Sequence, residues 1–253
     1  MAIIQLSLES FVTLDSMIKA WLHAARLRTL PLSLSGIIVG TGLAAVLGAF
    51  DGAIFGLALL TTIGFQVLSN FANDLGDSQK GTDNAERVGP ARAIQSGQLS
   101  AAQMKGGMWV VSLISLMSAF ALIYTSVPHL STNAIYFYIV LALACIVAAI
   151  TYTVGKNAYG YRGLGDIMVL VFFGLVSVIG VFMLYGEVFE WIVLFPAISI
   201  GLWSTAVLNL NNLRDIHNDT KMQKRRTNAE QEKAFNIITW YRSTSIRKDG
   251  KSP

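Results

Sequence analysis

Six long apolar segments alternate with shorter polar stretches along the chain. They lie at residues 29–50, 52–72, 106–126, 134–153, 164–185 and 189–210. A helix needs about 20 mostly apolar residues to cross the hydrocarbon layer of a bilayer, and each segment reaches about that length. The pattern therefore predicts an all-α protein, a polytopic bundle of transmembrane helices. In the first span, Gly36 and Gly40 form a pair of small residues one turn apart, which is typical of close helix packing in membranes.

The composition agrees with a membrane protein. Of the 253 residues, 53% are hydrophobic and 13% are charged, whereas soluble domains carry about 25% charged residues. This hydrophobic excess excludes a disordered chain. The chain contains one cysteine, Cys145, which excludes an internal disulfide and a cysteine-ligated zinc site.

The residues before the first span do not form a secretory signal. They lack a basic start, and Glu9 and Asp15 interrupt them. Residues 16–28 combine apolar positions with basic side chains. We expect this stretch to form a short amphipathic helix on the membrane surface.

The basic residues occupy alternate connections between the predicted spans. All 19 Lys and Arg residues lie before the first span, between spans two and three, between spans four and five, or after span six. The other connections carry acidic charges alone, at Asp51, Glu187 and Glu190. By the positive-inside rule, the N-terminus, the loops at 73–105 and 153–163, and the tail are cytoplasmic.

Two matching polar motifs end the second and sixth spans. Asn73 and Asp77 are four residues apart, as are Asn211 and Asp215, with Asp219 one turn later. This spacing places the side chains of each motif on one helix face. Asn and Asp also cap solvated helix ends, but two matching motifs on one side of the membrane favour a site for Mg²⁺, which prefers oxygen ligands. The candidate metal ligands are Asn73, Asp74, Asp77, Asp83, Asn211, Asp215 and Asp219.

Cationic side chains follow these motifs, and such groups bind diphosphate. The positive-inside rule would also place basic residues here. The candidates for contacting a diphosphate are Asn70, Arg87, Arg92 and Lys156. The basic run at 221–226 adjoins the membrane, where such runs bind anionic headgroups, so we expect no nucleic-acid partner.

Asp166 stands at the membrane entrance of the fifth span. A carboxylate there is costly and is usually functional. The alternative is an acid that a helix dipole stabilises at the helix N-terminus.

With these motifs the sequence resembles the UbiA superfamily of intramembrane prenyltransferases. That family carries NxxxDxxxD-like motifs after its second and sixth helices and a YxxxK motif, here Tyr152 and Lys156, between helices four and five. Within the superfamily, the chain looks most like the enzymes that prenylate 1,4-dihydroxy-2-naphthoate. The similarity covers roughly residues 20–220 and rests on the runs RLRTLPL, SNFANDLGDSQKGTD, RVGPARAIQSG, YGYRGLGD and NNLRDIHND.

The resemblance implies an activity. A polyprenyl group would pass from an all-trans-polyprenyl diphosphate to 1,4-dihydroxy-2-naphthoate, with loss of CO2 and diphosphate, giving demethylmenaquinol in menaquinone biosynthesis. Mg²⁺ would bridge the carboxylates and the diphosphate, and membrane lipid would surround the protein in a bacterial cytoplasmic membrane, with the active-site loops facing the cytoplasm. The catalytic candidates are Asp166 and Arg162, which would orient the acceptor, and Tyr152.

The sequence departs from the family pattern in two places. The last Asp position of the first motif is Gly81, with Asp83 two residues on. After Asp219 the family continues with three more membrane helices, whereas residues 221–253 are polar. We therefore expect six of nine transmembrane helices and a truncated C-terminus. This divides the chain into an N-terminal segment at 1–28, an incomplete transmembrane prenyltransferase domain at 29–220, and a basic tail at 221–253.

Three alternatives stay open. The acceptor could be 4-hydroxybenzoate or haem, as in related members of the superfamily. The chain could be an inactive fragment. A transporter is disfavoured, because transporter sites lie near the bilayer midplane on broken helices, whereas the acids here lie at the ends of the spans.

Overall fold

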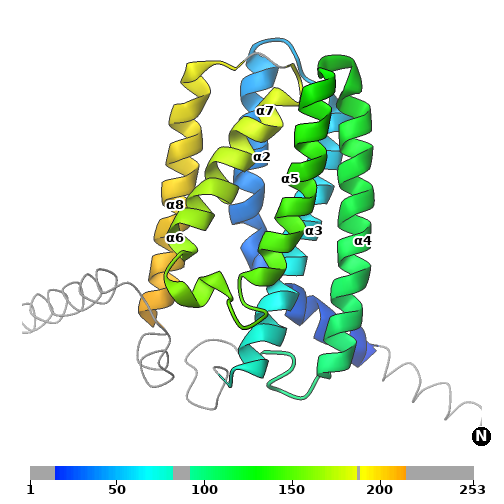
Figure 1. Cartoon of the computed structure of the whole chain (residues 1–253), viewed down its shortest axis with the longest axis vertical. Helices are drawn as coiled ribbons and strands as arrows, with labels where there is room; N and C mark the ends of the chain where they lie inside the picture. Colours follow the sequence, from blue (N-terminus) through cyan, green and yellow to red (C-terminus); the bar gives the residue numbers. More distant parts are fainter. Residues whose placement is uncertain (1–14, 82–91, 187–188, 215–253) are drawn as a thin grey trace, which may run out of the picture.

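The computed structural model describes residues 15–81, 92–186 and 189–214. Every regular element within these residues is a helix, and the long helices stand side by side as a bundle (Figure 1). The main elements are α2 (Leu30–Val46), α3 (Gly52–Gln79), α4 (Ala101–Ser126), α5 (Thr132–Thr151), α6 (Gly165–Val169), η4 (Leu170–Gly180), α7 (Val181–Met183) and α8 (Leu194–Arg214). Short 3₁₀ turns lie at η1 (Leu27–Thr29), η2 (Val127–His129), η3 (Tyr159–Arg162) and η5 (Trp191–Val193).

Six helical segments of the described chain are long and apolar enough to cross a membrane. The predicted all-α, polytopic membrane fold is therefore confirmed. The fifth span differs from a plain α-helix, because α6 and α7 are joined by the π-helical turns of η4. Such wide turns are rare and often occur at functional sites.

Side-chain caps explain where several helices begin. The Asp51 carboxylate accepts hydrogen bonds from the first backbone N–H groups of α3. Ser100 and Gln103 form a reciprocal capping box at the start of α4, ahead of the apolar segment that begins at residue 106. Caps of this kind satisfy backbone donors that have no partner within the helix.

The N-terminal helix is a separate element. Residues 15–25 are helical, and Arg26 then adopts a left-handed conformation with φ of 50°, which ends the helix before α2 begins. Trp21 packs on Phe71 of α3, with 5.3 Å between the ring centroids. This helix is therefore anchored to the bundle by an aromatic contact.

Small residues bring the bundle helices close together. α3 packs against α4 and α5, α8 packs against η4, and α2 contacts both groups. A Cβ atom on Gly40 would lie 2.5 Å from the backbone oxygen of Val178, and one on Gly174 would lie 2.8 Å from the Cα of Gly201. Substitution of these glycines would force the helices apart, which confirms the packing predicted for this part of the first span.

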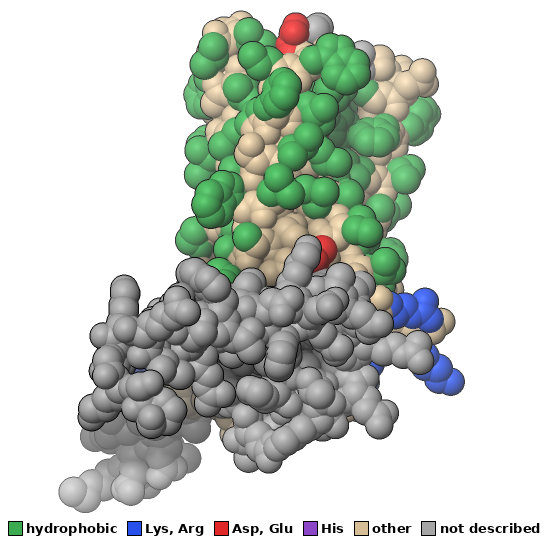
Figure 2. Space-filling model, turned by 90° about the vertical axis from the view of Figure 1, so that its left-hand side faces the viewer, with side chains coloured by type: hydrophobic (Ala, Val, Ile, Leu, Met, Phe, Trp, Pro, Cys, Tyr) green, Lys and Arg blue, Asp and Glu red, His purple; other side chains and the backbone are tan. Residues whose placement is uncertain are grey.

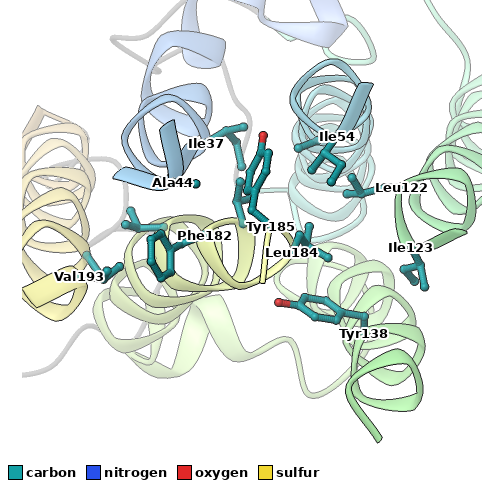
Figure 3. Close-up of a cluster of buried hydrophobic side chains, with 14 residues drawn as sticks. Ile37, Ala44, Ile54, Leu122, Ile123, Tyr138, Phe182, Leu184, Tyr185 and Val193 are labelled. Carbon is teal, nitrogen blue, oxygen red and sulfur yellow. The ribbon is translucent and has the colours of Figure 1, made fainter. Parts of the chain in front are cut away.

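Two clusters of buried apolar side chains lie at opposite ends of the bundle. One includes Leu68, Leu99 and Met104, near the polar end of α3. The other includes Ile54 and Phe182 and lies at the far end (Figure 3). On the face shown in Figure 2, hydrophobic side chains predominate between the ends of the bundle, and Lys and Arg appear only at the lower margin of its described part.

The charge pattern predicts that the loop at 153–163 faces the cytoplasm and that the connection between α4 and α5 faces the opposite side of the membrane. Residue 129 lies in the connection between α4 and α5, and residue 157 follows α5, so the two positions are at opposite ends of the bundle. Both His129 and Asn157 are exposed. In a Cys145→Ala background, a membrane-impermeant maleimide added to spheroplasts should label His129→Cys, and it should label Asn157→Cys only after the membrane is permeabilised. The opposite labelling pattern would invert the topology.

Candidate functional site

A cavity of about 330 Å³ runs through the bundle between α2, α3, α5, η4 and α8. Polar side chains line the cavity at the end where α3, α5 and α8 finish, and we call this end the mouth. The mouth residues are Thr29, Gln66, Asn73, Tyr152 and Asn211. Most of the remaining lining is apolar. The cavity can therefore hold a molecule with a polar head and a hydrocarbon body.

The mouth brings together the asparagines of the two sequence motifs. Asn73 belongs to α3 and Asn211 to α8, and both line the same cavity. The Asn73 Oδ1 accepts a hydrogen bond of 3.0 Å from the Thr153 hydroxyl, which fixes the orientation of the amide. Two segments far apart in the chain thus contribute matching polar groups to one place.

Asp77 lies one turn beyond Asn73 on α3 and is buried. Its side chain pairs with the Arg92 guanidinium at 2.5 Å, and the two side chains are 5% and 9% exposed. The Tyr161 hydroxyl donates a second hydrogen bond to the carboxylate. Because a buried charge is costly without a partner, the pair holds the residues around Arg92 against α3.

The neighbouring Asp74 has a different environment. It is 1% exposed, and its carboxylate accepts hydrogen bonds from the backbone N–H groups of Ala93 and Ile94 at 3.0 and 3.4 Å. It is absent from the cavity lining. Asp74 therefore secures the turn that follows Arg92.

Asn70 ties α3 to the N-terminal segment. Its amide nitrogen donates to the Ala25 carbonyl at 2.8 Å and to the Thr29 hydroxyl at 3.0 Å. Gln66, one turn earlier, also donates to Thr29 at 3.2 Å. Asn70 is buried away from the cavity lining, so its contact with the mouth is indirect, through Thr29.

The loop between α5 and α6 forms one wall of the mouth. Tyr152 lines the cavity, and its ring packs edge-on against Tyr159 at 5.2 Å. Burial raises the pKa of Tyr159, whose hydroxyl donates to the Ala148 carbonyl at 2.8 Å. Lys156 is exposed, and Arg162 is exposed and donates to Asn157 at 2.8 Å.

Asp166 opens α6 close to this wall. One carboxylate oxygen accepts a long hydrogen bond of 3.4 Å from Asn209 of α8. The other oxygen is buried and has no hydrogen-bond partner among the described residues. A buried acceptor without a donor is costly, although Asp166 itself is not among the residues that line the cavity.

The remaining predicted site residues lie outside the described part of the chain. These are Asp83, Arg87, Asp215 and Asp219. Within the described residues, no group of three or more His, Cys, Asp or Glu side chains is placed to hold a metal ion. The proposed metal set thus combines described ligands with ligands known from the sequence alone.

Sequence reasoning missed the contacts of Tyr161, Thr153 and Lys80. The Lys80 ammonium donates to the Thr153 carbonyl at 2.8 Å and lies 3.8 Å from the centre of the Tyr161 ring. Tyr161 falls within the run YGYRGLGD that carried part of the family resemblance. Its link to Asp77 was not visible, because the two residues are 84 positions apart.

Comparison with known proteins places the chain in a family of membrane enzymes. A model of the UbiA prenyltransferase family matches residues 33–241. The chain is 47% identical over 213 residues to a 1,4-dihydroxy-2-naphthoate octaprenyltransferase of Haemophilus influenzae, covering 83% of this chain and 68% of that protein. It is 45% identical to the enzyme of that name from Escherichia coli, covering 81% of this chain and 66% of that protein, and 36% identical to that from Mycobacterium leprae.

These alignments span about two thirds of the length of the relatives. No solved structure matches the chain significantly. The similarity to these relatives therefore rests on sequence.

The hydrogen bond from Tyr161 to Asp77 should stabilise the fold more than a neutral bond does. Hydrogen bonds to charged groups contribute about 1.5–3 kcal/mol, against about 0.5–1.5 kcal/mol for neutral ones. We therefore expect Tyr161→Phe to lower the thermal unfolding midpoint of the purified protein in detergent more than Tyr159→Phe does. The second variant is a matched control, because it removes a hydroxyl that donates to a neutral carbonyl. An equal or larger effect of Tyr159→Phe would contradict this assignment.

Proposed function

Since the chain belongs to the UbiA prenyltransferase family, we propose that it transfers a polyprenyl group from a polyprenyl diphosphate to 1,4-dihydroxy-2-naphthoate, with release of diphosphate and CO2. The similarity to 1,4-dihydroxy-2-naphthoate octaprenyltransferases supports this acceptor. The observation that carries the proposal is the cavity, whose polar mouth contains Asn73 and Asn211 and whose body is apolar. The mouth suits a diphosphate, and the body suits its hydrocarbon tail.

Two described residues at the end of α3 would fit a hard cation. The Asn73 amide lines the mouth, and the buried Asp77 carboxylate lies one turn farther along the same helix face. Both offer oxygen atoms, the ligands that Mg²⁺ prefers. Asn211 would add a further oxygen, and Asp83, Asp215 and Asp219 complete the proposed set from the sequence. Bound Mg²⁺ supplies charge neutralisation to the leaving diphosphate. We assign Asp74 to structural support, because its carboxylate binds backbone N–H groups of the turn at Ala93. The partners of Asp77 are instead the side chains of Arg92 and Tyr161, which can move when a cation binds.

Cationic side chains would bind the rest of the diphosphate. Arg92 is held beside Asp77, and Lys156 lies on the exposed loop that follows Tyr152. Arg87 is proposed from the sequence. These groups stabilise the negative charge that develops as the carbon–oxygen bond of the donor breaks. Asn70 acts on this side of the mouth through Thr29.

The wall of the mouth that is formed by the loop between α5 and α6 would orient the acceptor. The unpartnered oxygen of Asp166 can accept a hydrogen bond from a ring hydroxyl of the naphthoate, and Tyr152 lines the cavity beside the start of α6. A Cβ on Gly165 would lie 3.3 Å from the Tyr152 hydroxyl, so the two elements approach closely. Arg162 points to Asn157 in this structure, and it contributes positive charge to the same loop. The apolar body excludes water from the reacting allylic carbon.

The experiment that tests the activity follows the acceptor's carboxyl group. Purified protein in nanodiscs receives Mg²⁺, octaprenyl diphosphate and carboxyl-labelled 1,4-dihydroxy-2-naphthoate. We expect one labelled CO2 for each prenylated ring. The same assay with 4-hydroxybenzoate should give no prenylated product. Prenylation of 4-hydroxybenzoate in preference to the naphthoate would replace the proposed acceptor, and no product with either would refute the activity.

Asp77 should be essential for turnover. We expect Asp77→Asn to lower kcat/KM by at least about 100-fold, because it removes a charged ligand and leaves Arg92 without its ion pair. Asp51→Asn is the matched control, because it makes the same chemical change on α3 at the other end of the bundle while preserving a capping group. Full activity of Asp77→Asn, or activity retained in excess EDTA, would exclude this metal site.

A further inference from the structure

The apolar body of the cavity has a definite floor. Tyr138 of α5, Ile123 of α4, Ala58 of α3 and Leu184 line the cavity at the end away from the mouth. Residues farther along the same helices, such as Ile54 on α3, no longer line it and instead pack in the buried cluster. The cavity therefore stops at one layer of side chains, where the far-end cluster begins.

Tyr138 is the largest side chain in this layer, and it is fixed in place. It is 8% exposed, and its hydroxyl donates a hydrogen bond of 2.6 Å to the carbonyl of Gly180, the last residue of η4. Figure 3 shows Tyr138 extending from α5 with its hydroxyl turned toward the helix that carries Phe182. The residue thus spans the gap between the two walls of the cavity.

The distance from mouth to floor follows from helix geometry. On α5 and its C-cap the lining residues extend from Tyr138 to Tyr152 along one face. The fourteen steps from Tyr138 to Tyr152, at a rise of 1.5 Å each, give roughly 21 Å. An extended chain gains at most about 3.6 Å per three bonds, so a four-bond isoprene unit spans roughly 4.8 Å. The cavity therefore has room for about four isoprene units along its length.

The wall between mouth and floor is suited to hydrocarbon. Three of its hydroxyl groups bond to the wall itself: Thr61 bonds to Ser118 at 2.8 Å, Ser33 donates to the Leu30 carbonyl at 3.1 Å, and Ser177 donates to the Phe173 carbonyl. The buried Ser204 hydroxyl, which also lines the cavity, has no hydrogen-bond partner among the described residues. Polar groups that are satisfied, as the first three are, do not compete for a ligand. A hydrocarbon tail can therefore fill this space without leaving these three hydroxyls unpaired.

We propose that Tyr138 sets the length of isoprenoid tail that the cavity accommodates, by closing the end opposite the diphosphate-binding mouth. The proposal rests on the proposed function for the identity of the tail. The first four isoprene units of a donor lie between mouth and floor, and longer tails gain no further contact within the cavity. Replacing the ring with a small side chain extends the cavity by the space of the ring.

The test reads tail binding without requiring turnover. Cys145 is the only cysteine of the chain and lines the cavity between mouth and floor. Alkylation of Cys145 by N-ethylmaleimide is followed in nanodiscs containing Mg²⁺ and increasing C10, C15, C20 or C25 prenyl diphosphate, with inorganic diphosphate as the tail-free reference. The concentration for half-protection is measured for the wild type, Tyr138→Ala and Tyr138→Leu. Tyr136→Ala is the matched control, because it removes a neighbouring ring that is 64% exposed on the outer surface.

In the wild type and in Tyr136→Ala, the concentration for half-protection should fall with each added isoprene unit up to C20. It should then change less than twofold from C20 to C25. In Tyr138→Ala the concentration for half-protection should fall at least fivefold from C20 to C25. In Tyr138→Leu it should fall by a smaller factor. The same C20-to-C25 ratio in all four proteins would overturn the role of Tyr138, and so would absence of protection by any donor. Normal protection without prenylated naphthoate would refute the proposed activity while leaving the tail-length role supported.

Discussion

The buried ion pair between Asp77 and Arg92 is the interaction on which the mouth of the cavity depends. Both side chains are almost completely buried, and a charge in that position is tolerated only with a partner of opposite sign and further hydrogen bonds. Tyr161 supplies one of these bonds. Through this one carboxylate, the segment after Arg92 and the loop after α5 are both held against the end of α3.

Around that pair, α3 organises its neighbours through successive polar residues. Asn70 fixes the N-terminal segment, Asn73 meets Thr153, Asp74 caps the turn at Ala93, and Lys80 reaches the Thr153 carbonyl. Gly76 allows this, because a Cβ there would lie 2.6 Å from the Thr153 oxygen. The polar end of one helix thus positions three other segments, while the apolar remainder of the bundle forms a cavity for hydrocarbon.

The fold was predictable because the bilayer imposes a simple pattern on the sequence. Apolar length predicted the six spans, which the structure contains as six long apolar helices within its described residues. The polar residues from Asn73 to Gln79 continue the helix of the second span beyond residue 72, as the spacing of Asn73 and Asp77 predicts. They do so because their side chains bond to other segments, and hydropathy does not register such contacts.

Those parts of the site that depend on the spacing of residues along a helix could be predicted from the sequence. Those that depend on contacts between distant segments could not. The spacing of Asn73 and Asn211 at the ends of two spans indicated that they would meet, and both line the cavity. The sequence could not separate Asp74 from Asp77, since their difference lies in partners many residues away, namely the backbone at Ala93 and the side chain of Arg92. The π-helical η4 also carries no simple sequence signature, because its geometry depends on packing against α2 and α8.

A double-mutant cycle on the Asp77–Arg92 pair tests the central claim most directly. The thermal unfolding midpoints of Asp77→Ala, Arg92→Ala and the double variant are measured in detergent against the wild type. Each single variant leaves a buried charge without its partner, whereas the double variant removes both charges. We predict that the double variant melts no lower than the less stable single variant. Additive losses from the two substitutions would contradict a structure organised around this pair.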